Sequence, residues 1–391
     1  MILENKGRVK RELLTVYGEL KFKRTLLVPV DFESSQKLRL IQSEKSICPL
    51  DSYLGINNLP FKITVKMMVA IAKEAVRASS YERAATVIGE HYGVKISTAT
   101  VRSVTDYVGG VVYRDDCARA EKAYAEVGER IDKRRKRRNA GDVLYIEMDG
   151  AMFNTRVQVE GTSWAECKIG IAFHSKDIKE WVTRKNEIRR SITKKRLVGY
   201  IGNYKVFKGH VLALASRYDY RYCSQIVLIS DGADWIQTIK KELFPDAVHI
   251  LDLSHVKEHV GDFGKWINPD EKEAEKWITK INKMIEESKT DRVLKLLEPY
   301  AGKKCPANVL NLHTYILNHK ECMDYKSYIE KGYYVGSGAS ESANKYTMQN
   351  RMKLQGMRWN KSSGQNMLSL KARLESNCWH EVEELVRTAV Q

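Results

Sequence analysis

Apolar and polar residues alternate in the first part of the chain and then change to helical spacing. β-Branched residues alternate with charged ones over residues 13–16 and 21–30, which is typical of half-buried strands. Over residues 64–77 the apolar side chains instead recur every three or four positions, which predicts a helix. We therefore expect a strand-rich N-terminal region, residues 1–60, followed by a helical one.

Two shorter helices joined by a glycine turn come next. Residues 84–91 have an amphipathic pattern, Gly93 supplies the turn, and Ser97 is placed to cap a second helix. This is the arrangement of a DNA-binding helix-turn-helix, but two core helices of a bundle have the same pattern. If the pair binds DNA, the candidate contacts on the opening turns of the second helix are Thr98, Thr100 and Arg102.

A further helix is predicted from residue 111 to about residue 138, and its end is strongly basic. Its six consecutive basic residues are Lys133, Arg134, Arg135, Lys136, Arg137 and Arg138. Like charges in a row repel one another, so such a run needs either solvent around it or an anion to bind. It is therefore either a solvated linker or a contact with phosphates. Its place beside the helix pair favours phosphate contact. Residues 61–140 are therefore predicted to form one DNA-binding region.

From residue 143 the pattern changes to strands and then alternates strands with helices. Three successive strands are predicted over 143–151, 153–160 and 167–174. After a charged loop come a helix, a strand, a helix, a strand and a last helix, at 205–218, 226–233, 233–244, 247–251 and from Asp252 onward. The order βββαβαβα is that of a ribonuclease H-like mixed sheet, an α/β fold with three antiparallel strands and two strands that enter by helical crossovers.

Charged helical sequence interrupts this predicted domain. Residues 266–330 are predicted to be an all-helical insertion, whose apolar positions form a small core and whose lysine-rich faces are able to lie along DNA. The sheet domain then has a first part at 141–265 and a last part at 331–391, which ends in C-terminal helices.

Three carboxylates are candidates for chemistry. Asp149 and Asp231 each end a predicted strand and precede a glycine. Asp-Gly alone is an ordinary turn signal, but the pair ends two strands that meet in such a sheet. Glu341 follows a glycine- and serine-rich turn at the opening of a helix and is the candidate third carboxylate. Three such oxygen ligands suit two Mg²⁺ ions, or Mn²⁺ in their place, for phosphodiester chemistry.

A second motif competes for a catalytic role. Residues 255–259 fit H-x-x-E-H, a zinc-protease pattern in which His255 and His259 bind zinc and Glu258 is the general base. Asp252 and His255 are three positions apart on one helical face, which gives His255 an alternative role near a scissile phosphate. A protease would leave the paired strand-end aspartates and the helix pair unexplained.

The composition narrows the class of partner. The chain has 391 residues with 66 Lys and Arg against 49 Asp and Glu, a formal charge of +17. This excess favours nucleic acid. No apolar run reaches about 18 residues and the N-terminus is charged, so we expect no membrane segment and a cytoplasmic, nucleoid-associated protein. Seven scattered cysteines without a C-x-x-C pair exclude a disulfide framework and a zinc ribbon.

Several motifs together resemble a known family. They occupy residues 149–150, 230–236, 251–255, 336–345, 351–353 and 356–359. In these motifs the chain is similar to DDE transposases of the Mutator-like superfamily, and most similar to bacterial insertion-sequence transposases of the ISLre-two type. The resemblance implies a ribonuclease H-like domain with a helical insertion before the catalytic glutamate. It also implies Mg²⁺-dependent DNA cleavage and strand transfer at the terminal inverted repeats of an element.

The resemblance also assigns residues. It implies that Asp149, Asp231 and Glu341 form the metal-binding triad, and that Asp252 and His255 match the accompanying D-x-x-H motif. The expected partner is double-stranded DNA, at element ends and target, bound by a homodimer or higher oligomer. Beyond Glu341 the expected DNA contacts are Arg351, Lys353, Arg358 and Trp359, although a buried core role suits Trp359 equally. The alternative class is a transposase-derived DNA-binding regulator that has lost catalysis.

Overall fold

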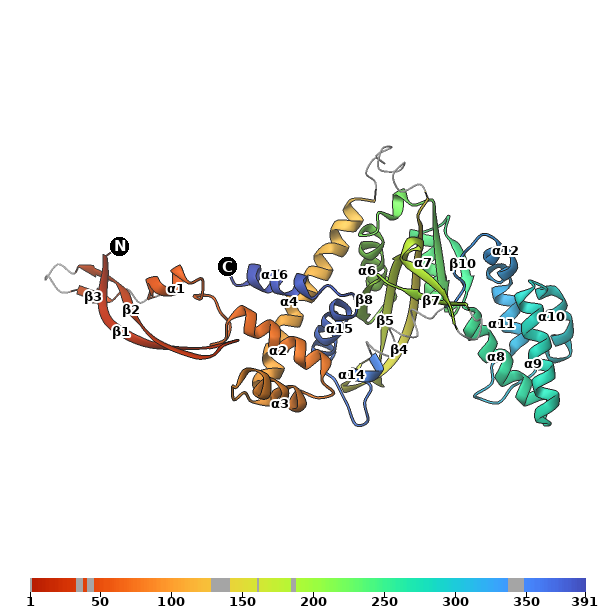
Figure 1. Cartoon of the computed structure of the whole chain (residues 1–391), viewed down its shortest axis with the longest axis horizontal. Helices are drawn as coiled ribbons and strands as arrows, with labels where there is room; N and C mark the ends of the chain where they lie inside the picture. The colour runs from red at the N-terminus through yellow and green to blue at the C-terminus, as the bar shows by residue number, and fades with distance from the viewer. Residues whose placement is uncertain are drawn as a thin grey trace. The chain divides into compact units, whose positions relative to one another are not determined.

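The computed structural model describes residues 2–32, 38–40, 46–127, 141–159, 162–183, 188–336 and 348–391. The chain forms two compact units (Figure 1), one of Met1–Asp116 with Asn350–Gln391 and one of Cys117–Gln349. The basic run from Lys133 to Arg138 and the proposed ligand Glu341 lie outside the described residues.

The first unit begins with an antiparallel sheet, as the alternation of the first 60 residues predicted. Its strands are β1 (Ile2–Thr15), β2 (Gly18–Phe32) and β3 (Leu38–Leu40), and the short helix α1 (Pro49–Tyr53) packs on β2. The buried carboxylate of Asp51 on α1 accepts hydrogen bonds from Arg11 of β1, at 2.9 Å, and from Arg24 of β2. This ion cluster fixes α1 to one face of the hairpin.

Helices make up the rest of the first unit. They are α2 (Val65–Arg77), α3 (Tyr81–Tyr92), α4 (Thr98–Ala125), α14 (Asn350–Met352), α15 (Lys361–Glu375) and α16 (Trp379–Ala389). The predicted helix pair is present as α3 and the start of α4. Gly93 ends α3 with φ +62°, and the Ser97 hydroxyl accepts from the Thr100 backbone N–H at 3.0 Å.

The helix α4 corrects one prediction. The sequence predicted a separate helix starting at residue 111, but α4 runs through Gly109 and Gly110 without a break and ends at Ala125. A Cβ atom at Gly109 would lie 2.7 Å from Asn366 of α15. The glycine therefore permits a close approach of two helices and does not end one.

The C-terminal helices belong to the first unit, whereas the sequence grouped residues 331–391 with the sheet domain. Arg373 of α15 is buried, and its guanidinium lies 3.0 Å from Asp115 on α4 and 3.7 Å from Glu381. Buried charges of this kind need their partners. This ion cluster therefore ties α15 to α4.

The second unit is built on a five-stranded mixed sheet of order β10-β9-β4-β5-β8. The strands are β4 (Val143–Val159), β5 (Thr162–His174), β8 (Arg196–Ile201), β9 (Gln225–Ser230) and β10 (Val248–Leu251). The first three are antiparallel neighbours, whereas β9 and β10 run parallel to β4. A separate hairpin joins β6 (Ile178–Val182) to β7 (Ile188–Ile192).

Two predicted strands differ from those observed. The two strands predicted over 143–151 and 153–160 are one continuous strand, β4, which ends at Val159, because its pairing with β5 extends from Leu144 to Asn154 without a register shift. The third antiparallel strand is β8, in a segment that the sequence assigned to a charged loop. The residues of β8 alternate between buried and half-buried, which marks it as a strand once its partner β5 is known.

Helices cover the sheet and extend beyond it, as predicted. Those that follow strands are α6 (Tyr204–Ser216), α7 (Asp234–Leu243) and α8 (Leu253–Ile267). Leu144, Ile146 and Met148 of β4 pack on α6 and α7 in one hydrophobic core. The side chains of Tyr145, Glu147 and Asp149 alternate with them and lie on the other face.

Residues beyond α8 form helices and the turns that connect them, up to residue 330. The α-helices are α9 (Glu271–Glu286), α10 (Thr290–Leu297), α11 (Leu312–His319) and α12 (Tyr325–Glu330). Four single-turn 3₁₀ helices of this unit are η1 (Ser175–Asp177), η2 (Tyr220–Tyr222), η3 (Glu298–Tyr300) and η4 (Lys320–Cys322). Figure 1 shows α9 to α12 gathered in one group. Across the described ranges, no helix combines the length and apolar character needed to cross a membrane.

Replacing Gly109 by alanine is expected to lower the free energy of unfolding by about 1 to 3 kcal/mol, because the new Cβ would push α4 away from α15. Gly110→Ala is the matched control. Its Cβ would meet Arg114 and Asn366 only at 3.7 and 3.8 Å, so helix propensity should stabilise that variant by up to about 1 kcal/mol. Urea unfolding followed by circular dichroism measures both changes, and equal effects would contradict the close contact at Gly109.

Candidate active site at the ends of the parallel strands

Three aspartates lie at the same edge of the sheet. Met148 of β4 is paired with Ser230 of β9, and Ser230 is paired with Leu251 of β10. Asp149, Asp231 and Asp252 each come one residue later. Asp231 and Asp252 follow the last residues of β9 and β10, whereas Asp149 lies inside β4, which continues to Val159, so the prediction that Asp149 ends a strand is wrong. Neighbouring strands are about 4.8 Å apart, so the backbones of Asp149 and Asp231 lie about 5 Å from each other. The structure thus brings two of the three predicted triad positions to adjacent places, with the predicted Asp252 on the next strand.

Local hydrogen bonds fix the three carboxylates. In each, the Oδ1 atom accepts from a nearby backbone N–H. The pairs are Asp149 with Gly150 at 2.7 Å, Asp231 with Ala233 at 3.0 Å, and Asp252 with Ser254 at 2.9 Å. The last bond makes Asp252 the N-cap of α8, which places His255 on the first turn of that helix. Bonds of this kind hold each carboxylate in one rotamer before any ligand arrives.

Two histidines of α8 lie next to this edge. The Nε2 atoms of His255 and His259 are 3.0 Å apart, and the ring of His259 packs on Tyr315 of α11 with centroids 5.0 Å apart. Burial lowers the pKa of His259, and the neighbouring His255 lowers it further, although the Asp231 carboxylate acts in the opposite direction. These effects favour the neutral form of His259.

Tyr315 contacts the strand end itself. Its hydroxyl donates to the backbone carbonyl of Asp231 at 3.1 Å. Burial raises the pKa of Tyr315, and the carboxylates of Asp231 and Asp252 raise it further, so the group stays a neutral donor. The sequence assigned this segment to the core of a helical insertion and missed the contact. The only sequence signal for this contact was the four-residue spacing of Tyr315 and His319, which puts them on one face of α11.

The two described candidate residues suit a hard cation in their chemistry. Asp149 and Asp231 offer carboxylate oxygens, which Mg²⁺ and Mn²⁺ prefer. Among the residues that the structure describes, no three His, Cys, Asp or Glu side chains lie close enough together to hold a metal ion. The two aspartates therefore need a further ligand, and Glu341, the third expected one, lies outside the described residues.

The chain approaches the aspartate-bearing face just before the undescribed segment. The backbone N–H of Tyr334 donates to the hydroxyl of Tyr145 at 3.1 Å, and the Tyr334 ring packs edge-on against Tyr145 and Phe173. Tyr145 lies on the same face of β4 as Asp149. The segment that leads to residue 336 therefore runs over the face from which Asp149 projects.

The H-x-x-E-H motif is only partly assembled. His255 and His259 come together, but the side chain of Glu258 is 69% exposed and lies 3.6 Å from His255 Nδ1. A catalytic zinc needs three protein ligands, and among the described residues no third one joins the histidine pair.

The candidate residues of the helix pair are accessible. Thr98 and Arg102 are exposed on the first turns of α4, and Thr100 is half-buried beside the Ser97 cap. Arg102 lies 3.9 Å from Asp106 one turn later, a weak surface pair that leaves the guanidinium solvated.

The C-terminal candidates divide into exposed and buried residues. Lys353 and Arg358 are exposed, as phosphate contacts require. Arg351 is only 2% exposed, stacks between the rings of Tyr81 and Trp359, and donates from Nε to the Ala75 carbonyl at 3.0 Å. Its planar guanidinium joins core aromatic rings here and is not available to phosphates, which corrects the sequence assignment. Trp359 is buried as well, the second of its two expected roles.

The sequence missed one basic surface. On the exposed face of the β1–β2 hairpin, Lys10 lies directly opposite Lys23, and Arg8 is the next residue on that face. Like charges opposite one another destabilise a hairpin, so these lysines do not stabilise the sheet. The alternation of basic residues at positions 6, 8 and 10 was the available signal. We name Arg8, Lys10 and Lys23 the ribbon patch.

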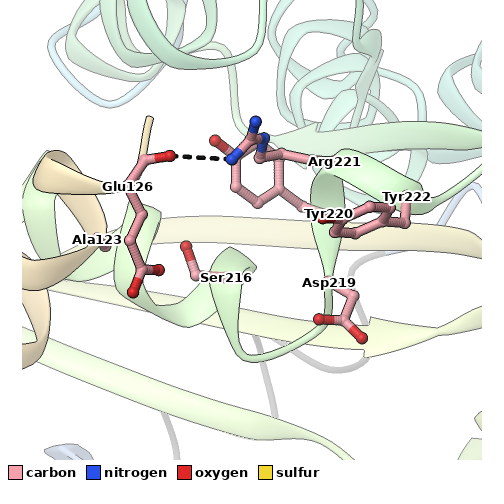
Figure 2. Close-up of a pocket in the computed structure, with 7 residues that line it drawn as sticks. All are labelled: Ala123, Glu126, Ser216, Asp219, Tyr220, Arg221 and Tyr222. Carbon is pink, nitrogen blue, oxygen red and sulfur yellow. Dashed lines mark hydrogen bonds between the residues drawn. The ribbon is translucent and has the colours of Figure 1, made fainter. Parts of the chain in front are cut away.

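A pocket lies at the other end of the second unit's sheet. Figure 2 shows it lined by Ala123, Glu126, Ser216, Asp219, Tyr220, Arg221 and Tyr222, with Arg221 donating to the carbonyl of Glu126 at 2.9 Å. These residues precede the start of β9, whereas Asp231 follows its end. The pocket is therefore separate from the three aspartates.

The fold and the site together define a mixed α/β protein with two neighbouring aspartates, one within β4 and one just after β9. The model of the uncharacterised protein family UPF0236 matches residues 3–387, and the chain belongs to that family. A search of curated proteins gives no match.

We expect the purified protein to contain less than one zinc per chain, because the described residues offer the histidine pair no third ligand. Metal analysis by mass spectrometry checks this, with His259→Ala for comparison. One zinc per chain in the wild type that is lost in His259→Ala would contradict this expectation and favour the protease.

Proposed function

We propose that this protein is a DDE transposase that binds the terminal inverted repeats of an insertion sequence and catalyses DNA cleavage and strand transfer. The observation that carries the proposal is that Asp149, within β4, lies beside Asp231, which directly follows the end of the parallel neighbour β9. Three antiparallel strands joined by two parallel ones, in the order β10-β9-β4-β5-β8, support a ribonuclease H-like fold. The helical segment between β10 and Glu341 agrees with the insertion that the resemblance implies.

In this proposal Asp149, Asp231 and Glu341 hold two divalent cations. When bound, Mg²⁺ stabilises the charge that develops on the attacking and leaving oxygens at phosphorus. The aspartates contribute fixed carboxylates, each already oriented by a backbone N–H. Asp252 and His255 stand beside them, where His255 is placed to contact a scissile phosphate.

Two in-line displacements make up the reaction. In the first, water attacks the phosphodiester at an element end, the P–O3′ bond breaks, and a 3′ hydroxyl is freed. In the second, that hydroxyl attacks a target phosphodiester and the bond to the target 3′ oxygen breaks. Because each step exchanges one P–O bond for another, neither step needs an oxidant or a nucleotide cofactor.

Basic groups on the surface support DNA as the partner. Arg102 on the second helix of the pair, Lys353, Arg358 and the ribbon patch are exposed. A net charge of +17 favours association with a polyanion in a salt-dependent way. Two element ends have to be brought together for strand transfer, so we propose that the active form is a homodimer or a higher oligomer.

The competing proposal is a DNA-binding regulator without catalysis. A regulator would use the same basic surface but would not need Asp149 and Asp231 next to each other. The two proposals differ in whether the protein cuts the DNA that it binds.

Asp231→Asn and Asp149→Asn are expected to lower Mg²⁺-dependent nicking of DNA carrying the terminal repeats by on the order of a hundredfold or more, because electrostatic stabilisation at phosphorus is lost. The measurement is nicking of labelled duplex, with DNA binding followed in parallel by gel shift. Asp234→Asn is the matched control, since Asp234 is exposed on the first turn of α7, three residues from Asp231.

The control variant should nick at the wild-type rate, and all three variants should bind DNA as the wild type does. Binding without nicking by the wild-type protein would support the regulator. Equal nicking by Asp231→Asn would contradict the two-cation proposal.

Arg102→Ala is expected to weaken DNA binding severalfold and to reduce the slope of log affinity against log salt by about 1, because one phosphate contact is lost. Fluorescence anisotropy at several salt concentrations measures the slope. Arg387→Ala is the comparison, since Arg387 is an exposed arginine of α16 paired with Glu383. An identical slope in wild type and Arg102→Ala would indicate that the helix pair is a structural part of the unit and that Arg102 does not contact DNA.

A further inference from the structure

Side chains of α11 bind the backbone around Asp231. Tyr315 donates to the carbonyl of Asp231 at 3.1 Å. The His319 ring lies between two carbonyl oxygens, with Nδ1 2.8 Å from that of Tyr315 and Nε2 3.0 Å from that of Gly232, and a neutral ring donates to one of them while a protonated ring donates to both. Two side chains of one helix thus contact two consecutive carbonyls. Asp231 lies between β9 and α7, so these bonds restrain the turn from outside it.

The fit at Gly232 is tight. Its φ is +93°, and a Cβ atom there would lie 2.5 Å from His319 Nε2 and 2.9 Å from Leu251 Cδ1. Only glycine adopts this conformation with so little space. The Asp-Gly pair that the sequence identified as a strand-end signal is therefore also the surface on which α11 packs.

A second set of bonds reaches the same turn from the other side. The Gly232 backbone N–H donates to Ser230 Oγ at 3.2 Å, which lies 2.8 Å from His249 Nε2. His249 Nδ1 is 3.4 Å from the thiol of Cys322 in η4. The chain of bonds therefore begins, like α11, in the helical segment beyond α8.

These groups are neutral. Burial lowers the pKa of His249 to about 4 and raises that of Cys322 to about 11. With neutral groups the bonds run in one of two senses: the thiol donates to His249 Nδ1 and Nε2–H donates to Ser230, or the Ser230 hydroxyl donates to Nε2 and Nδ1–H donates to the sulfur. A cysteine in this state is not an activated nucleophile, so the Cys322–His249 pair has a structural role.

We propose that Tyr315 and His319, supported by Cys322 through His249 and Ser230, are positioning residues that hold Asp231 in its cation-binding orientation. In this proposal the helical segment has a role at the site, because its side chains help to position the carboxylate of Asp231. The inference rests on the proposed function only in taking Asp231 as a cation ligand. Groups that orient the ligands of a metal commonly change its affinity by about ten- to a hundredfold.

Other tyrosines of the same segment supply a matched control. Tyr328 donates to the carbonyl of His249 at 3.3 Å, and Tyr325 donates to that of Leu251 at 2.9 Å. Both carbonyls belong to β10, the edge strand of the sheet. Tyr328→Phe removes the same kind of bond as Tyr315→Phe, here shared between the carbonyls of His249 and Glu321, and does not remove a bond of the His249 ring or of the Asp231 turn.

The experiment compares the full-length wild type, Tyr315→Phe and Tyr328→Phe in two measurements. Mn²⁺ alone is titrated by calorimetry, and amide hydrogen exchange is followed at residues 232–234. We expect Tyr315→Phe to bind Mn²⁺ about tenfold more weakly and to exchange faster at these amides. Tyr328→Phe should bind Mn²⁺ within about twofold of the wild-type affinity, even if its thermal stability falls as much as that of Tyr315→Phe.

The possible outcomes separate the two proposals. Unchanged exchange and unchanged Mn²⁺ affinity in Tyr315→Phe would overturn the positioning role. An equal loss of Mn²⁺ affinity in Tyr328→Phe would overturn it too, because the effect would then be one of general stability. Faster exchange in Tyr315→Phe alone, together with a wild type that does not bind Mn²⁺, would support the restraint on the turn and overturn the cation-binding function of Asp231.

Discussion

The parallel pairing of β4 with β9, and of β9 with β10, is the constraint on which the candidate site depends. It places Asp149, Asp231 and Asp252 at one level of the sheet, although more than 100 residues separate the first from the last. A register shift of one residue would turn a strand's side chains to the opposite face. The apolar residues Leu144, Ile146 and Met148 oppose this shift, because it would remove them from the core with α6 and α7 and put Glu147 and Asp149 in their place.

The helical segment beyond α8 contributes to this constraint from outside the sheet. Tyr325 and Tyr328 bind carbonyls of the edge strand β10, which would otherwise be open to water or to another chain. Tyr315 binds the carbonyl of Asp231. The same helices therefore protect the sheet edge and restrain the turn beside it, so a single insertion contributes to both folding and the site.

Local pattern predicted most of the elements, because side-chain period and caps are local properties. Ser97, Gly93 and Asp252 marked helix ends that the structure confirms. The pattern failed where a partner distant in sequence decides. Gly109 lies inside a helix because Asn366 packs on it, and β8 is a strand because β5 pairs with it. The positions of the three aspartates were predictable from local pattern, because each follows a run of buried residues, although Asp149 does not end its strand. The roles of Tyr315 and His319 needed the fold.

The distribution of charge shows why a count of basic residues does not locate a DNA surface. Arg351 and Arg373 are buried, where one stacks on Tyr81 and Trp359 and the other pairs with Asp115. Both therefore stabilise the first unit and are removed from any electrostatic attraction to phosphates. Lys10 and Lys23, in contrast, face each other across a hairpin at a cost to its stability. A charge that opposes folding and remains exposed is better evidence for a polyanionic partner than one that folding already uses.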